Sequence, residues 1–246
     1  MANPYFHQGD QRAAKVNELF SKIARRYDLL NDLQSFGLHR YWKHRLLNLA
    51  QVHPGIRALD ICCGTGDIAL SFARHGAEVT GVDFSQPMLD IAVARANAAR
   101  RHSTLDTRHS TLFIRADAER LPFDDAQFQI VSVGYGLRNL ASWEKGLSEM
   151  QRIAAPGARI LVLDFGKPQS VLWRSIYFAY LRFFVPCLGR LFAGSTDAYS
   201  YILESLKHYP AQEGVAAKMR ELNLQNVQVV NLLGGVMSIN YGEKLR

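Results

Sequence analysis

The sequence has few cysteines, and their spacing suits neither a metal site nor a disulfide framework. It contains three in 246 residues, Cys62, Cys63 and Cys187, with no C-x-x-C pair and no histidine pair nearby. Structural zinc sites need several cysteine or histidine ligands at short spacing, and a disulfide framework needs an even set of cysteines. We therefore expect no metal ion, no disulfide framework and a reducing compartment.

The sequence also lacks the segments that direct a chain to a membrane or across it. Its first residues, MANPYFHQGDQ, contain no basic stretch followed by an apolar run, so we expect no signal peptide and a cytoplasmic protein. The most apolar segment, residues 171–194, is interrupted by Arg174, Arg182 and Arg190, which argues against a transmembrane helix. Because this segment is too apolar and aromatic for a solvent-facing helix, we expect it to line an apolar surface.

Acidic residues are in the minority: 22 Asp and Glu stand against 29 Lys and Arg, a formal net charge of +7. This balance favours an anionic partner such as nucleic acid, acidic lipid or phosphate. A content of 48% hydrophobic and 21% charged residues is ordinary for a soluble globular protein, and 246 residues suffice for one large α/β domain.

Short apolar runs alternate with helical patterns through the middle of the chain. Strands are predicted at residues 57–61, 78–83, 112–116, 128–133 and 158–165, and helices at 67–75, 87–100 and 142–153. Such alternation predicts a parallel, doubly wound sheet. After a helix that follows Pro210, the stretch NVQVVNLLGGVMSIN predicts an antiparallel hairpin, with its turn near Gly234, at the sheet edge. We therefore expect a Rossmann-like α/β fold in a single domain, 1–246.

Two helical segments fall outside the predicted sheet. Residues 12–50 carry apolar side chains at helical spacing, followed by the basic, aromatic stretch HRYWKHR at 39–45. The apolar positions are Val16, Leu19, Phe20, Ile23, Tyr27 and Leu30. We expect this segment to form a helical cap, and residues 167–209 to form a second helical insertion over the active site.

The stretch LDICCGTGD has the pattern of a cofactor-binding turn. Gly64, Gly66 and Ala69 fit G-x-G-x-x-A between a strand and a helix, and Asp83 ends the next strand. NAD-binding domains share this fingerprint. Asp60, four residues before the first glycine, favours a ligand with a cationic amine over a pyrophosphate, and S-adenosylmethionine carries such an amine. We interpret the two cysteines of the stretch as small packing residues.

Three aspartates are predicted to lie at the carboxyl ends of successive strands. Asp60, Asp83 and Asp117 would line one crevice there, where doubly wound sheets bind ligands. We expect Asp83 to accept hydrogen bonds from ribose hydroxyls, and Asp117 with the Ala118 backbone to meet adenine. Each aspartate taken singly is better explained as a helix cap or turn residue, and only the three together favour a binding site.

Several motifs resemble those of the ubiquinone/menaquinone C-methyltransferases of the UbiE/COQ5 family. They are DICCGTGD, GVDFSQPML, DAERLPF, GYGLRN, PGARILVLDF and YILESLKHYP, and the likeness runs from about Val16 to the C-terminus. Many class I methyltransferases share the glycine turn, whereas GLRN, YDLLN and YILESLKHYP are more specific to the family. The resemblance implies the class I methyltransferase fold and methyl transfer from S-adenosylmethionine to a ring carbon of a polyprenylated quinol. We expect demethylmenaquinol as the substrate, and the sequence leaves a benzoquinol open.

The resemblance also implies site residues. Together with the residues above, the expected cofactor-binding set is Asp60, Gly64, Thr65, Gly66, Asp83, Phe84, Met88, Asp117 and Ala118. The position just before YGLRN is often serine in the family and is Gly134 here, so no side-chain contact is assigned to it.

The implied chemistry requires alignment and the handling of one proton. A quinol hydroxyl that loses its proton makes the adjacent ring carbon nucleophilic. Arg138 and Asn139 are the candidate catalytic residues, because a guanidinium stays protonated but can stabilise the forming phenolate. We expect Arg138 at the mouth of the crevice, and the alternative is a loop cation paired with a carboxylate. His39, His208 and water are candidate proton acceptors.

Other functions stay open on the sequence. A nucleic-acid methyltransferase would explain the positive charge, but VGYGLRN stands where amino-directed enzymes place an N-P-P-Y-like stretch. An NAD-dependent oxidoreductase would share the glycine turn but leave Asp60 unexplained, and a lipid-binding protein would leave all three aspartates unexplained. We therefore expect a quinol or another lipophilic small molecule as substrate, peripheral contact with the inner face of the membrane, and no nucleic acid. A homodimer and a quinone-biosynthesis complex are both open.

Overall fold

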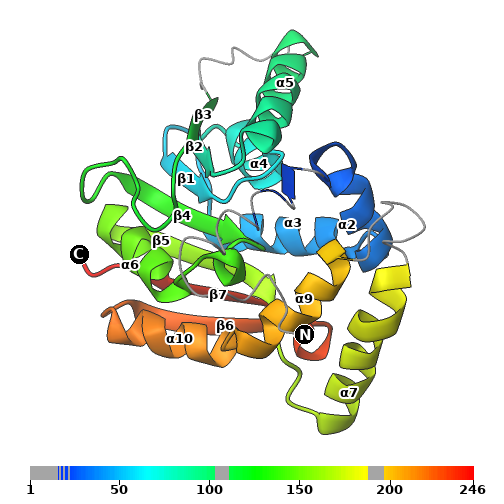
Figure 1. Ribbon diagram of the computed structural model, residues 1–246. Coiled ribbons are helices and arrows are strands. Elements are labelled where there is room, and N and C mark those ends of the chain that lie inside the picture. Colours follow the sequence, from blue (N-terminus) through cyan, green and yellow to red (C-terminus); the bar gives the residue numbers. More distant parts are fainter. Residues whose placement is uncertain (1–15, 17, 19, 22, 103–110, 188–196) are drawn as a thin grey trace.

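One mixed sheet forms the centre of the structure (Figure 1). The computed structural model describes residues 16, 18, 20, 21, 23–102, 111–187 and 197–246. Within them the strands are β1 (Arg57–Ile61), β2 (Glu78–Asp83), β3 (Thr111–Arg115), β4 (Phe128–Gly134), β5 (Ala154–Phe165), β6 (Gln225–Leu232) and β7 (Met237–Glu243). Their order is β3-β2-β1-β4-β5-β7-β6, with β1 to β5 parallel and β7 antiparallel to both β5 and β6. The predicted doubly wound sheet with its C-terminal hairpin is confirmed.

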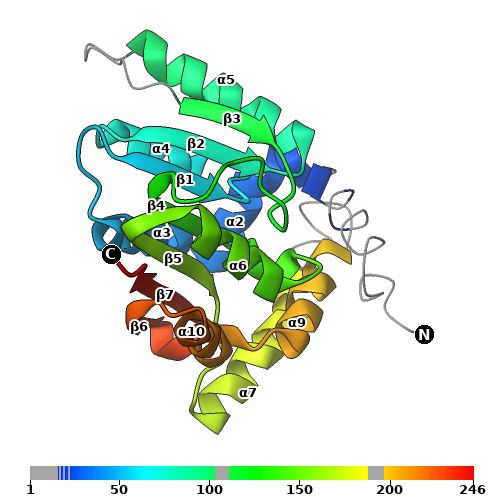
Figure 2. The ribbon, with the colours of Figure 1, turned by 90° about the vertical axis from the view of Figure 1, so that its left-hand side faces the viewer.

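Helices cover both faces of the sheet because the chain builds it outward from β1 in two directions. It passes from β1 through α4 (Asp67–Arg74) to β2, and from β4 through α6 (Trp143–Ile153) to β5 on the other side. Right-handed crossovers in opposite directions place the two helices on opposite faces. α3 (Leu38–Ala50) packs beside α4, and α10 (Ala211–Glu221) packs beside α6 (Figure 2). α5 (Gln86–His102) packs against β2 and β3.

The element bounds follow local chemistry, and most of them lie within two residues of the predicted ones, whereas β5 and η4 differ more. α6 begins where expected because the Ser142 side chain accepts a hydrogen bond from the Lys145 N–H and caps the helix. β5 begins at Ala154 rather than at residue 158, because Ala154 still pairs with Phe128 of β4 before the register shifts. A π-helical turn, η4 (Tyr180–Phe184), was not predicted, because the apolar pattern of this segment does not distinguish it from an α-helix.

Two helical segments pack against one another at the carboxyl ends of the parallel strands (Figure 1). The first contains η2 (Ala24–Arg26) and α2 (Tyr27–Ser35), which leads into α3. The second contains α7 (Val171–Ala179), η4 and α9 (Asp197–His208). The Tyr180 hydroxyl of η4 donates to the Gln34 carbonyl of α2 at 2.7 Å. Parts of the expected cap and insertion, 12–15, 17, 19, 22 and 188–196, lie outside the described residues.

Candidate functional site

The predicted cofactor-binding turn connects β1 to α4 at the point where the strand order reverses. Gly66 has a φ of 84°, and a Cβ there would lie 3.1 Å from the Ala92 side chain and 3.2 Å from the Phe113 ring. Gly64 has a φ of 54°, and a Cβ there would have a Tyr27 ring atom as its neighbour at 3.9 Å. Gly66 therefore allows the turn to pack tightly, whereas Gly64 leaves space beside the backbone for a ligand.

Asp83 ends β2 and faces this turn. Its Oδ2 accepts a hydrogen bond from the Gly64 N–H at 2.8 Å, and its Oδ1 accepts one from the Ser85 N–H at 2.8 Å. Burial raises the pKa of this carboxyl above its ordinary value. Each oxygen has a second lone pair, so Asp83 can hold the turn in place and still accept hydrogen bonds from a ligand diol.

A pocket opens beside Asp83, with about 1000 Å³ of empty space, part of it open to solvent. Its lining is mostly apolar but holds Asp83 and Asp117, and we call it the polar pocket for these carboxylates. Its lining includes Gly64, Asp83, Phe84, Met88, Asp117 and Ala118 from the predicted cofactor-binding set. Asn139 also lines it, and the Asn139 Oδ1 is buried with no hydrogen-bond partner in the described part of the chain. Asp117 is exposed, and its Oδ1 accepts from the Glu119 N–H at 2.9 Å, so it also serves as a turn residue. The structure therefore brings six predicted residues together around one pocket.

Asp60 does not share the polar pocket with Asp83 and Asp117, which corrects the expected single crevice. It lies inside β1, buried, where its Oδ1 accepts from the Ser132 hydroxyl at 2.8 Å and its Oδ2 from the Ala69 N–H at 3.2 Å. Burial raises the pKa of Asp60 to about 7. Its carboxylate lines a smaller adjoining pocket below the turn, because side chains inside a strand point across the sheet rather than beyond its end.

Thr65 is held by a polar network that the sequence did not reveal. Its hydroxyl donates to Asp28 Oδ1 at 2.9 Å, and Arg95 donates to Asp28 Oδ2 at 3.1 Å and to Thr65 Oγ1 at 3.0 Å. Arg95 also pairs with Asp67, to which Lys43 donates at 2.6 Å. The network ties α2, α3 and α5 to the turn. The part of the sequence that could have indicated this network is Asp28, which lies in the motif YDLLN.

The two cysteines of the turn pack between elements. Cys63 is buried and Cys62 is half-buried, and burial raises the pKa of both thiols well above the ordinary value. A Cβ at Gly136 would lie 2.3 Å from the Cys62 Cβ, so Cys62 occupies the space between the turn and the loop after β4. Protonated, tightly packed thiols agree with the packing interpretation.

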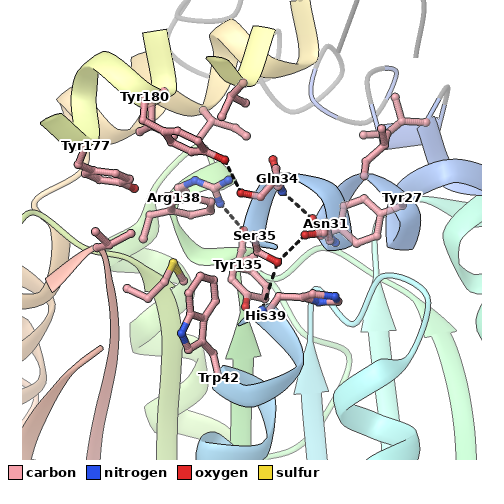
Figure 3. Close-up of a pocket in the computed structure, with 18 of the residues that line it drawn as sticks. Tyr27, Asn31, Gln34, Ser35, His39, Trp42, Tyr135, Arg138, Tyr177 and Tyr180 are labelled. Carbon is pink, nitrogen blue, oxygen red and sulfur yellow. Dashed lines mark hydrogen bonds between the residues drawn. The ribbon is translucent and has the colours of Figure 1, made fainter. Parts of the chain in front are cut away.

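An apolar pocket adjoins the polar pocket, with about 900 Å³ of empty space, part of it open to solvent (Figure 3). Its lining comes mainly from α2, α3, the loop after β4, the end of β5, the start of β7, and the helices α7, η4 and α9. That lining includes Tyr27, His39, Trp42, Tyr135, Arg138, Phe165, Tyr177, Tyr180, Leu181 and Val185. In its described part, the segment 171–194 therefore lines an apolar surface as predicted. Tyr27 and Tyr135 line both pockets, so their rings lie at the boundary.

Arg138 is buried at the wall of the apolar pocket and not at the mouth of a crevice, which corrects the expectation for this residue. Its side chain is 5% exposed, and its Nη1 lies 3.3 Å from the Asp164 carboxylate, which is 2% exposed. Nη1 also donates to the Tyr135 carbonyl at 2.5 Å, and the guanidinium lies 4.5 Å from the centre of the Phe165 ring. The alternative, a loop cation paired with a carboxylate, describes the observed arrangement.

The structure separates the two histidines that were candidate proton acceptors. His39 is buried and lines the apolar pocket, whereas His208 is exposed on α9 and lines neither pocket. The hydroxyls of Tyr135 and Tyr177 are buried without hydrogen-bond partners among the described residues. Tyr135 lies in the motif GYGLRN, whereas nothing in the local sequence of Tyr177 marked it, because its position depends on how the second helical segment packs on the first.

A model of the ubiE/COQ5 methyltransferase family matches residues 8–244 of the chain. The chain belongs to the ubiE/COQ5 methyltransferase family. It is 38% identical over 239 residues to the ubiquinone/menaquinone biosynthesis C-methyltransferase UbiE of Azotobacter vinelandii, covering 95% of this chain and 91% of that protein. It is 36% identical over 241 residues to the demethylmenaquinone methyltransferase of Desulfitobacterium hafniense, covering 97% of this chain and 93% of that protein.

This ubiE/COQ5 chain has the same fold as a methyltransferase whose structure has been solved. The phosphoethanolamine N-methyltransferase 2 of Haemonchus contortus, in complex with S-adenosyl-L-methionine, superposes with a TM-score of 0.61 at 16% identity, covering 83% of this chain and 52% of that one. Likeness at that identity shows the fold alone. The shared fold and the membership in the family together identify the chain as a class I, S-adenosylmethionine-dependent C-methyltransferase.

Proposed function

We propose that this ubiE/COQ5 methyltransferase methylates a ring carbon of a polyprenylated quinol, and of demethylmenaquinol in particular. The observation that carries the proposal is the pairing of two pockets across Tyr27 and Tyr135. One contains the Asp83 carboxylate beside the glycine turn, and the other has aromatic walls. A methyl donor in the first pocket would meet an aromatic ring in the second at their shared boundary.

The polar pocket has the chemistry that S-adenosylmethionine needs. This cofactor supplies a methyl group activated by a sulfonium. Asp83 would accept hydrogen bonds from the ribose hydroxyls, and Asp117 with the Ala118 backbone would meet the adenine edge. Met88 and Phe84 would give the adenine an apolar wall. Gly64 supports this fit, because it lines the pocket and a Cβ there would have a Tyr27 ring atom, at 3.9 Å, as its nearest described neighbour.

The small pocket below the turn would hold the amino-acid end of the cofactor. Asp60 and Thr65 both line it. A cationic amine near Asp60 would favour the ionised carboxylate, whose pKa burial otherwise raises. Gly66 would contribute by shaping the turn above them.

We assign the two catalytic roles to neighbouring residues that face different pockets. Arg138 lines the apolar pocket, where its guanidinium would stabilise the negative charge of a forming phenolate. Asn139 lines the polar pocket, and its buried amide oxygen would meet a polar group close to the cofactor. With a methyl donor in one pocket and the quinol ring in the other, these neighbouring residues would act on opposite sides of the methyl-transfer step.

We also propose that the enzyme takes its substrate from a membrane surface. Large apolar side chains are exposed outside the apolar pocket, with Phe36 at 72%, Leu172 at 73% and Phe183 at 68% exposure. Arg182 lies 5.5 Å from the Phe183 ring centre, and Arg40, four residues after Phe36 in the chain, is exposed. Apolar side chains mixed with basic ones suit an anionic bilayer. Among the helices of the described residues, none is both long and apolar enough to cross a bilayer.

A product analysis tests the proposed reaction. The purified chain is incubated with methyl-labelled S-adenosylmethionine and, in separate samples, a demethylated naphthoquinol and a demethylated benzoquinol, and the products are identified by mass. We expect one methyl group on the ring of the naphthoquinol. The oxidised quinone is the control and should not react, because it has no hydroxyl proton to lose. Absence of transfer to both quinols would refute the proposal.

A further inference from the structure

His39 is a buried histidine whose two ring nitrogens have different environments. It is 4% exposed, lies on α3, and lines the apolar pocket near Ser35 and Trp42 (Figure 3). Its Nε2 lies 2.7 Å from Asp32 Oδ1. Its Nδ1 is buried and has no hydrogen-bond partner within the described residues. Buried polar atoms are nearly always satisfied, so an unpartnered nitrogen on a residue that lines a pocket points to a ligand.

Asp32 is held so that it can set the state of the ring. Arg40 donates to Asp32 from Nε at 2.9 Å and from Nη2 at 2.7 Å, and these bonds, followed by the one from His39, hold the pKa of Asp32 well below its usual range. A carboxylate can only accept, so Nε2 carries the proton and the lone pair of neutral His39 is on Nδ1. Asp32 would also stabilise the imidazolium that forms when Nδ1 gains a proton.

The other charged groups near the ring keep it neutral before the reaction. Burial is the main effect that lowers the pKa of His39, and Lys43, one turn further along α3, lowers it too. Asp32 on α2 and Asp67 on α4 act in the opposite direction without reversing the shift. His39 is therefore a neutral acceptor at neutral pH.

The other ionisable groups at the wall of this pocket are poor proton acceptors. Burial raises the pKa of Tyr27, Tyr135 and Tyr177, so these hydroxyls stay protonated and can only donate to an anionic oxygen. Arg138 stays protonated in its pair with Asp164. Among the described lining residues, the His39 imidazole is the group whose free lone pair suits a hydroxyl proton.

We infer that His39 is the general base of methyl transfer, with Asp32 as its positioning residue. The inference rests on the proposed function. The quinol O–H gives its proton to His39 Nδ1, and the electron pair left on oxygen makes the adjacent ring carbon nucleophilic. That carbon forms a bond to the methyl carbon as the methyl–sulfur bond breaks and its electrons stay on sulfur. The ring carbon then loses its hydrogen to water while the imidazolium returns a proton to the oxygen, so one proton is released overall.

The test compares three variants of the full chain with a short-tailed, water-soluble quinol. His39→Gln keeps a donor in the Nε2 position for Asp32 but has no Nδ1 acceptor. Its kcat should fall about 100- to 10,000-fold, the range for loss of a general base, with S-adenosylmethionine affinity unchanged by calorimetry. Asp32→Asn should move the acid limb of the kcat/KM profile to lower pH, because an imidazolium without its carboxylate loses its proton more readily. His44→Gln, on the exposed side of the same helix, is the matched control and should behave as wild type.

The outcomes separate this inference from the proposed function. If wild type methylates the quinol and His39→Gln keeps a near-normal kcat, His39 is not the base. A rise in KM alone, or loss of cofactor affinity in His39→Gln, would also overturn the assignment in favour of a binding or structural role. If wild type methylates no quinol, the proposed function fails and this inference fails with it.

Discussion

At the residue scale, the ion pair of Arg138 and Asp164 links stability to the assigned catalytic role. Burial raises the pKa of Asp164, and the neighbouring Arg138 opposes that rise. The same guanidinium lines the apolar pocket, so one residue serves both the core and the proposed site. Replacing it alone therefore tests two functions at once, and a paired substitution is needed to separate them.

Arg138→Ala should lower the free energy of unfolding by about 3–5 kcal/mol, because it leaves the Asp164 carboxylate buried without a counter-ion. Adding Asp164→Asn should restore part of this loss, since a neutral amide tolerates burial better than a lone carboxylate. Turnover of the double variant should stay at least about 100-fold below wild type, because the guanidinium is still missing. Urea unfolding and the methylation assay give the two measurements. Recovery of turnover together with stability would show that Arg138 acts only structurally.

Asp60 makes stability depend on pH in a predictable direction. Its pKa of about 7 in the folded protein exceeds the ~3.9 of an exposed aspartate, so between these values the folded state binds more protons than the unfolded state. The contribution of Asp60 to stability is therefore full below about pH 4 and declines as pH rises toward 7.

Asp60→Asn removes this titration and keeps an acceptor for its partners. In the cofactor-free protein, wild type should lose stability between pH 4 and 7 through Asp60, and the variant should not. The free energy of unfolding of the variant minus that of wild type should therefore rise by more than about 1 kcal/mol over this range. Urea titrations across that range measure it. Asp90→Asn, on the exposed face of α5, is the control and should show no such trend. A pH-independent difference for Asp60→Asn would mean that Asp60 titrates alike in both states.

At the element scale, the junction between β1 and α4 depends on the left-handed backbone at Gly66. Gly55 has a similar φ, 80° against 84°, but a Cβ at Gly55 would meet nothing within 4 Å. The two glycines therefore differ mainly in the space around them, since a Cβ at Gly66 would approach Ala92 and Phe113.

Gly55→Ala should lower the free energy of unfolding by about 1–2 kcal/mol, the cost of the left-handed conformation for an L-residue. Gly66→Ala should lower it by more, and should also weaken S-adenosylmethionine binding, because relief of the close contacts moves the turn. Urea unfolding and calorimetry on both variants make the comparison. Equal losses of stability with unchanged affinity would show that the turn accommodates a side chain at Gly66 freely.

At the scale of the whole molecule, the apolar pocket and the exposed apolar side chains are on the same helical segments. Phe36 follows α2, and its ring lies 6.1 Å from that of Phe184 in η4, so the two segments meet at the surface as well as at the pocket wall. With a formal net charge of +7, the molecule favours an anionic surface. A quinol tail and a bilayer would then be met by the same side of the protein.

The double substitution Leu172→Ser and Phe183→Ser should reduce flotation with vesicles that contain anionic lipid. Arg182→Ala should weaken binding by about 1 kcal/mol, an effect that fades at high salt. Leu112→Ser is the matched control, because Leu112 is 54% exposed but lies on β3, the edge strand at the opposite end of the sheet from β6. Equal flotation of all variants and wild type would exclude this surface as the membrane contact.

The sequence by itself determined the sheet, its connections and the cofactor-binding turn. Strand and helix periods, the glycines at 64 and 66 and the cap at Ser142 act over a few residues, so they can be read locally. Six of the nine predicted cofactor-binding residues line the polar pocket for the same reason, since carboxyl ends of parallel strands meet at one edge.

Only the tertiary structure decided which side chains share the apolar pocket and what their partners are. Arg138 meets Asp164, 26 residues away, because β4 and β5 pair with Gly134 opposite Leu163 and bring the loop after β4 beside the end of β5. His39 lines that pocket because α2 and α3 fold back over the sheet. Such contacts join elements that are far apart in the sequence. The periodicity of apolar residues indicates the structure of each element separately, so no local pattern encodes these contacts.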